Sequence, residues 1–126
     1  MFSKTYAPAM RFDSHTLILL VRPPDAPELS DEDAAILQDA HLAHQAELRA
    51  QGHVIAAGPL VDQDDERLRG IVVLAVDPET ARRLYSEDPA VRAGRLAIQT
   101  MTWLTPAGSA EFHPVAMPAS MAEAED

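Results

Sequence analysis

Two histidines lie three residues apart in a segment whose apolar spacing predicts a helix from residue 31 to about 51. The helical repeat places His41 and His44 on one stripe with the apolar side chains of Ala34, Leu37 and Leu48. Because such a stripe faces the core, both imidazoles are expected to point toward a neighbouring layer. An imidazole changes charge near neutral pH, so in a cleft it can act as a general acid or base. The alternative is that both are structural histidines, satisfied by backbone groups or water.

A metal site is the second chemistry that this pair allows, since side chains at this spacing share one face of a helix. The sequence has no cysteine and no HExxH motif, and a third ligand would have to come from another segment. It also lacks the glycine-rich motifs that bind nucleotides and dinucleotides. We therefore expect neither a bound metal nor a cofactor.

Asp88 stands directly before Pro89, a pairing typical of a helix start, where the carboxylate accepts hydrogen bonds from backbone N–H groups. Asp77 before Pro78 is the same dipeptide, and nothing suggests that it does chemistry. On this pattern alone Asp88 is a structural cap. A capping carboxylate still has free lone pairs, so it can bind a second partner as well.

Four further residues are candidates for contacts with a small molecule. Gly58 and Pro59 end a predicted strand, where a glycine lets a ligand or a partner backbone approach closely. Arg22 and Arg92 can bind the carboxylate of an organic acid, although a plain surface position is the simpler interpretation of each. Trp103, the single tryptophan, is expected in the core or at an interface.

Strands and helices alternate along the middle of the chain. Runs of branched apolar residues predict strands, and capping residues followed by helical spacing predict helices. The expected strands cover residues 15–22, 53–60, 70–76 and 95–104, and the expected helices cover residues 31–51 and 78–87, with a short turn at 89–94. This order predicts a ferredoxin-like α+β fold, in which a four-stranded antiparallel sheet carries both helices on one face.

The two ends of the chain lack this pattern. We divide the chain into an N-terminal extension at residues 1–14, a folded domain at 15–105 and an acidic tail rich in Ala and Pro at 106–126. The tail is expected to be frayed; alternatively, Phe112, Val115 and Met117 dock on a partner subunit.

One face of the expected sheet has no helix to cover it. The first and third strands are too apolar for a face in contact with water. A second copy of the same sheet is the simplest cover, so we expect a homodimer formed through the sheet faces.

The composition narrows the classes of partner. The chain has 126 residues and a formal net charge of −10, with 10 basic and 20 acidic side chains. Binding to nucleic acids or anionic membranes depends on clustered basic residues, so neither is expected. No apolar run is long enough to span a membrane, and the first residues do not resemble a secretion signal. We expect a cytoplasmic protein whose partner is a small molecule.

The segment HLAHQAELRAQGHVIAAGPL resembles the signature of the YciI-like (YCII-related) proteins. In this family a helix that carries a His is followed by a Gly and then by a strand ending in Ala-Gly-Pro. A second stretch, EDPAVRAG, resembles the family's Asp-Pro segment, and the final strand with Trp103 is also similar. The matching positions are His41, Leu42, Leu48, Gly52, Ala57, Gly58 and Pro59 in the first segment, and Asp88, Pro89, Val91 and Gly94 in the second.

This resemblance covers about residues 15–105 and implies a dimeric α+β barrel with an active site built on a His–Asp pair, at His41 and Asp88. His44 is outside the family pattern, so its role stays open, and Ala90 stands where a larger residue is common. Some relatives are similar to small lyases or dehydrochlorinases that act on ring compounds, and related barrels include isomerases and monooxygenases.

The leading hypothesis is a small enzyme without a cofactor, in which His41 moves a proton and Asp88 orients the imidazole and stabilises its charged form. Suitable reactions are proton abstraction beside a carbonyl, isomerisation, or elimination on a small organic acid. The alternative is a non-catalytic dimeric module that binds a small ligand or supports a larger complex. A third hypothesis is a metal-binding protein that uses His41 and His44.

Overall fold

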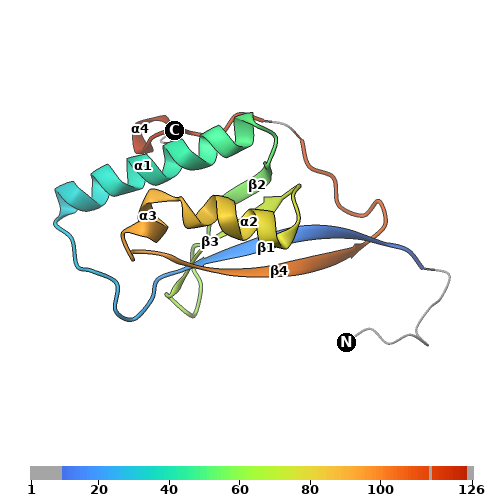
Figure 1. The fold of residues 1–126 in the computed structure, drawn as a ribbon, viewed down its shortest axis with the longest axis horizontal. Coiled ribbons are helices and arrows are strands. Elements are labelled where there is room, and N and C mark those ends of the chain that lie inside the picture. Colours follow the sequence, from blue (N-terminus) through green and yellow to red (C-terminus); the bar gives the residue numbers. More distant parts are fainter. Residues whose placement is uncertain (1–9, 114, 125–126) are drawn as a thin grey trace.

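A computed structural model describes residues 10–113 and 115–124 of the chain. Its elements are β1 (Phe12–Val21), α1 (Asp31–Ala50), β2 (Val54–Pro59), β3 (Leu68–Leu74), α2 (Pro78–Ser86), α3 (Pro89–Arg92), β4 (Ala97–Pro106) and α4 (Met121–Ala124). The predicted α+β order is confirmed, with the short helices α3 and α4 in addition (Figure 1). Residues 1–9 of the expected N-terminal extension lie outside the described residues, and β1 begins within that extension.

The four strands form one antiparallel sheet in the order β2-β3-β1-β4, which is the arrangement of the ferredoxin-like fold. β1 is a central strand: Ile18 is the partner of Val72 in β3 and of Thr100 in β4. The register with β3 shifts between Leu20 and Val21, at the end of the sheet. A central strand of this kind fixes the relative positions of three strand ends, and these ends shape the site described below.

Capping interactions determine where the two main helices begin. The Ser30 hydroxyl accepts a hydrogen bond from Asp33 N (3.1 Å) before α1, and the Asp77 carboxylate accepts one from Thr80 N (3.1 Å) before α2. After α1, Gly52 has a φ of +84°, a conformation that glycine adopts without strain. These signals define the length of α1 and therefore the position of its histidines.

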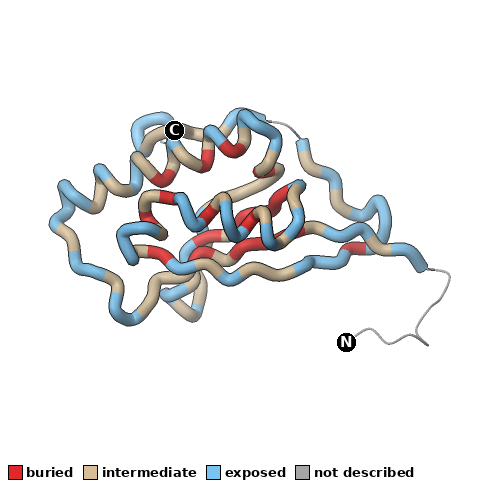
Figure 2. The backbone as a smooth tube through the Cα atoms, in the orientation of Figure 1, coloured by how far each residue is buried: buried red, intermediate tan, exposed pale blue. Residues whose placement is uncertain are grey.

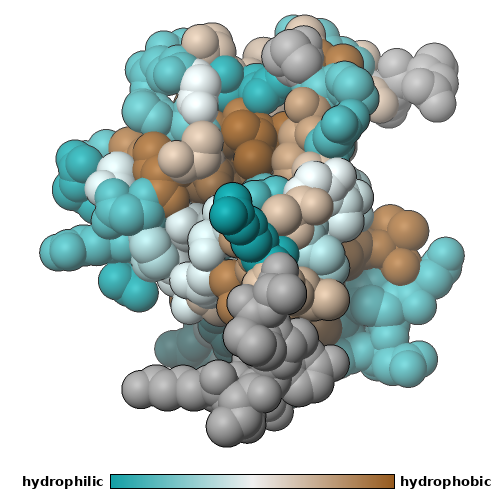
Figure 3. Space-filling view, turned by 90° about the vertical axis from the view of Figure 1, so that its right-hand side faces the viewer, coloured by the Kyte–Doolittle hydropathy of each residue, from teal (hydrophilic) through white to brown (hydrophobic). Residues whose placement is uncertain are grey.

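The hydrophobic core lies between the sheet and the helices (Figure 2). On α1 the predicted stripe is confirmed at His41 and Leu48, which are buried, whereas His44 is half-buried and Gln45 occupies a buried position. Seen from the right-hand side of Figure 1, hydrophobic residues gather across the middle of the molecule (Figure 3). The core includes Ile18, Leu20, Val72 and Leu74 from the sheet, and Leu48, Ala81 and Tyr85 from the helices.

Alternate residues of the central strands point to the opposite face of the sheet, away from the helices. Leu17 of β1 belongs to this face, and its cross-strand partners are Val73 in β3 and Met101 in β4. Leu19 and Trp103 extend the apolar surface, and Trp103 is 41% exposed. We call these five residues the open-face patch.

The C-terminal segment packs along α1 (Figure 1). Arg49 Nε donates to Val115 O (3.0 Å), Arg49 Nη2 donates to His113 O (3.2 Å), and Met121 N donates to Asp39 Oδ1 (2.8 Å). The expectation of a frayed tail is therefore wrong for these residues. The segment is held by its backbone groups, which a side-chain pattern does not reveal, and by the Met117 side chain, which packs against the core of its own chain.

Candidate active site

Asp88 is the residue around which the site is built. It precedes α3, and its Oδ2 accepts hydrogen bonds from Ala90 N (3.0 Å) and Val91 N (3.3 Å), so the predicted capping role is confirmed. The Asp88 side chain is fully buried. A buried carboxylate needs partners for both of its oxygens, so the surroundings of Oδ1 decide what else this residue does.

Both histidines of α1 donate to that second oxygen. His41 Nδ1 lies 2.8 Å from Asp88 Oδ1, and His44 Nδ1 lies 3.2 Å from the same atom. An ionised carboxylate can only accept hydrogen bonds, so each ring carries a proton on Nδ1. In a neutral imidazole the other nitrogen, Nε2, is then free to accept a proton. The sequence-based pairing of His41 with Asp88 is thus present as a direct hydrogen bond.

Asp88 remains ionised in this buried position. Burial alone would raise the pKa of the carboxyl group, but the hydrogen bonds and charges of His41 and His44 outweigh this effect and lower the pKa of Asp88 to about 2. A negative charge therefore lies beside both imidazoles at neutral pH. It stabilises either ring in the protonated form that proton transfer would create.

Tyr85 and Gln45 extend the cluster. The Tyr85 ring meets the His44 ring edge-on, with centroids 5.9 Å apart, and its hydroxyl donates to Gln45 Oε1 (3.1 Å). Burial, reinforced by the charge of Asp88, raises the pKa of the Tyr85 phenol, which stays a neutral donor. Sequence analysis named neither residue. The available signal was spacing, because Gln45 lies one helical turn after His41 and Tyr85 lies shortly before Asp88.

His41 also lines a cavity of about 990 Å³ between α1, the sheet and the C-terminal segment, whereas His44 and Asp88 do not line it. Since Nδ1 of His41 is bonded to Asp88, Nε2 is the ring nitrogen that remains for a molecule in the cavity. Much of the wall is apolar and is formed by Leu20, Leu37, Leu42, Leu96, Met117 and Met121. The cavity can therefore hold the carbon skeleton of a small molecule beside one basic nitrogen.

Three of the remaining sequence candidates, Gly58, Pro59 and Arg22, line the same cavity. Arg92 lies exposed on α3 and is not part of the lining. A Cβ atom built on Gly58 meets nothing within 4 Å, so the packing of this chain leaves space there for a ligand or a partner backbone. Arg69 and Arg95, which sequence analysis did not select, also line the cavity.

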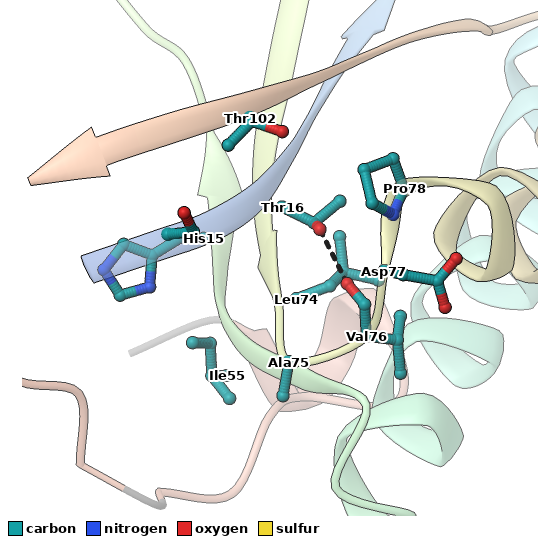
Figure 4. A pocket seen from close by; sticks show the side chains of 10 residues that line it. His15, Thr16, Ile55, Leu74, Ala75, Val76, Asp77, Pro78 and Thr102 are labelled. Carbon is teal, nitrogen blue, oxygen red and sulfur yellow. Dashed lines mark hydrogen bonds between the residues drawn. The ribbon is translucent and has the colours of Figure 1, made fainter. Parts of the chain in front are cut away.

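A second cavity, of about 480 Å³, lies near the beginning of β1 and the start of α2 (Figure 4). On its wall Thr16 Oγ1 donates to Val76 O (2.6 Å). Its titratable lining residues are His15, which contacts Thr105 Oγ1 (3.2 Å), and Asp77, which caps α2. No acid–base pair is formed between these lining residues, so the larger cavity is the candidate active site.

Within residues 10–113 and 115–124, no three His, Asp or Glu side chains are grouped in a way that could hold a metal ion. The helices of this described part are too short or too polar to cross a bilayer.

Comparisons with known proteins identify the family to which this chain belongs. A solved structure of 5-chloro-2-hydroxyhydroquinone dehydrochlorinase (TftG) from Burkholderia phenoliruptrix AC1100, in complex with 2,5-dihydroxybenzoquinone, is similar to this chain at 20% identity and a TM-score of 0.44. The match covers 71% of this chain and 90% of that chain. No curated protein matches the sequence. The family model of the YCII-related domain matches residues 16–103, which include His41 and Asp88, and the chain therefore belongs to the YCII-related domain family.

Proposed function

We propose that the protein is a small acid–base enzyme in which His41 transfers a proton to or from a small organic acid. The observation that carries this proposal is the 2.8 Å hydrogen bond between His41 Nδ1 and Asp88 Oδ1, on a ring that also lines a cavity of about 990 Å³. The arrangement supplies a base, a group that orients the base, and a space for the reacting atom.

The proposed step begins with neutral His41. Its Nε2 takes a proton from a carbon next to a carbonyl group, and the electron pair of the C–H bond moves into an enolate. The imidazolium that forms keeps its Nδ1–H bond to Asp88, whose negative charge stabilises it. The proton then returns to the same carbon, moves to another carbon in an isomerisation, or stays on His41 while the enolate expels a leaving group.

Isotope exchange tests this step without knowledge of the natural substrate. Small carboxylic acids that carry a C–H bond beside a carbonyl are incubated with the protein in D₂O, and deuterium uptake at that carbon is followed by proton NMR. We expect exchange with the wild type and a rate lower by about 100-fold or more with His41→Gln, since one positioned acid–base group typically contributes about 10²–10⁴ in rate.

His44→Gln is the matched control, because His44 bonds the same oxygen of Asp88 but does not line the cavity. This variant should retain most of the exchange. An equal loss in both variants contradicts the proposal. Acids that bind in the cavity but never exchange contradict it too, and this result favours the non-catalytic ligand-binding module.

We also propose that the protein is a homodimer formed through the open-face patch. The five residues of the patch carry no charge. Leu17 and Val73 are already buried within one chain, and a two-fold pairing would bury the apolar surface that Leu19, Met101 and Trp103 leave accessible on both copies. In sedimentation experiments the wild type should be a dimer and Trp103→Glu a monomer. A wild-type protein that sediments as a monomer contradicts this proposal.

A further inference from the structure

Three arginines from distant parts of the sequence meet at one end of the sheet. Arg22 directly follows β1, Arg69 lies in β3, and Arg95 precedes β4. β1 runs between β3 and β4 and antiparallel to both, so that Val21 is the partner of Leu68 and also of Ala97. The end of one strand therefore coincides with the beginnings of its two neighbours. All three arginines consequently line the cavity that also contains His41.

Backbone carbonyl groups hold these three guanidinium groups in place. Arg22 Nε donates to Arg95 O (2.9 Å), Arg95 Nη1 donates to Pro27 O (2.7 Å), and Arg69 Nη1 donates to Glu66 O (3.2 Å). Within the described part of the chain, none of the three forms an ion pair with a carboxylate. Each group is thus oriented by the fold but keeps N–H donors and a positive charge that the chain does not neutralise.

The three arginines are also close enough to act on one another. Burial lowers the pKa of the Arg22 guanidinium, and the neighbouring charges of Arg95 and Arg69 lower it further. Two acidic residues, Asp31 and Glu123, line the same cavity, but neither forms an ion pair with these arginines.

This absence of pairing stands out because the chain carries 20 acidic residues and only 10 basic ones. An uncompensated group of cations inside a cavity favours an anionic ligand.

We infer that Arg22, Arg69 and Arg95 bind the carboxylate of the ligand, while the apolar wall beside His41 holds its carbon skeleton. A guanidinium presents two parallel N–H donors that match the geometry of a carboxylate. This inference rests on the proposed function and narrows the substrate class to small organic acids with an apolar body. Arg22 was a sequence candidate for this role, and Arg69 and Arg95 take the place that Arg92 was expected to share.

Benzoate and benzamide are suitable probes, because they have the same ring and differ in charge. Their binding to the full-length protein is measured by NMR titration at low salt. Arg69→Gln is the sharpest variant, since Arg69 is exposed and its side chain bonds one loop carbonyl. Arg22→Gln is the second variant, with circular dichroism to verify its fold. Arg83→Gln is the matched control, because Arg83 is exposed on α2 and outside the cavity.

We expect benzoate to bind more tightly than benzamide, and each cavity variant to weaken benzoate binding by about tenfold, in the range of one charge-assisted hydrogen bond. Benzamide binding should not change in any variant, and Arg83→Gln should behave as the wild type. Benzoate that binds no better than benzamide overturns the inference, as does an equal loss in Arg83→Gln.

The two proposals can fail separately. Benzoate binding that depends on Arg22 and Arg69 supports the anion subsite even if no acid exchanges deuterium, a result that would remove the proposed enzyme. Exchange that depends on His41 without any preference for benzoate removes the subsite and leaves the proposed enzyme intact. Binding of benzoate to His41→Gln at wild-type affinity is the expected sign that the subsite is independent of the base.

Discussion

Replacing Asp88 with Asn is the substitution that most directly tests the buried cluster. Oδ2 of Asp88 accepts from two backbone N–H groups, and Oδ1 accepts from two imidazole N–H groups. An Asn side chain has nearly the same shape but offers one acceptor oxygen and one NH₂ donor. Whichever way the amide turns, its NH₂ group faces donors on one side. The negative charge beside His41 and His44 is also lost.

The size of the effect follows from the pKa of Asp88. Lowering this pKa from 3.8 to about 2 stabilises the folded state, because the folded protein binds the proton less readily than the unfolded chain. Each pKa unit corresponds to about 1.4 kcal/mol, so the carboxylate contributes about 2 kcal/mol at neutral pH. A depressed folded-state pKa gives stability that is complete above the unfolded value and is lost as the pH falls toward the folded value.

Urea unfolding of wild type and Asp88→Asn, followed by circular dichroism, measures this contribution as a function of pH. The difference in unfolding free energy should be about 2 kcal/mol at pH 5 and roughly half of that at pH 3. Titration of the other carboxylates affects both proteins and cancels in the difference. Asp77→Asn, at the exposed cap of α2, is the matched control and should show a smaller difference. A difference for Asp88→Asn that is the same at pH 5 and pH 3 would refute the reasoning.

Three further predictions concern Gly70 in the cavity wall, the C-terminal segment and the histidine tautomers. Gly70→Ala should lower the unfolding free energy by about 1–3 kcal/mol, because its Cβ would lie 3.3 Å from the backbone oxygen of Gly58; Gly58→Ala is the control, and equal melting temperatures for the two contradict the prediction. Arg49→Gln should speed proteolytic cleavage within residues 107–124, because the two hydrogen bonds from Arg49 to His113 O and Val115 O are lost, and unchanged cleavage would show that other contacts hold the segment. Above neutral pH, ¹⁵N NMR should find His41 and His44 protonated on Nδ1, since both donate to a carboxylate; a prevailing Nε2–H form of His41 would contradict the site geometry.

The order of the elements and their approximate limits could be predicted from the sequence because the physical causes are local. The helix expected at residues 31–51 is observed at Asp31–Ala50, since a capping serine begins it and a glycine follows it. The first and last strands, expected at 15–22 and 95–104, are observed at Phe12–Val21 and Ala97–Pro106. The first begins earlier and the last ends later than expected because Phe12 pairs with Pro106 across the sheet, and a pairing partner so distant in the chain leaves no local signal.

The same distinction between local causes and long-range packing applies to the residues of the candidate site. Helical periodicity and the Asp-Pro dipeptide indicated His41 and the cap at Asp88, because each depends on neighbours within one or two turns. Only the tertiary structure decided that Gln45 is more buried than His44, because the line on which α1 crosses the sheet selects the buried face. The same holds for the meeting of Arg69 and Arg95 with Arg22, which depends on strand order, and for the C-terminal segment, whose backbone groups bond to side chains of α1. Contacts of this kind come from the packing of distant segments, and no spacing within one segment encodes them.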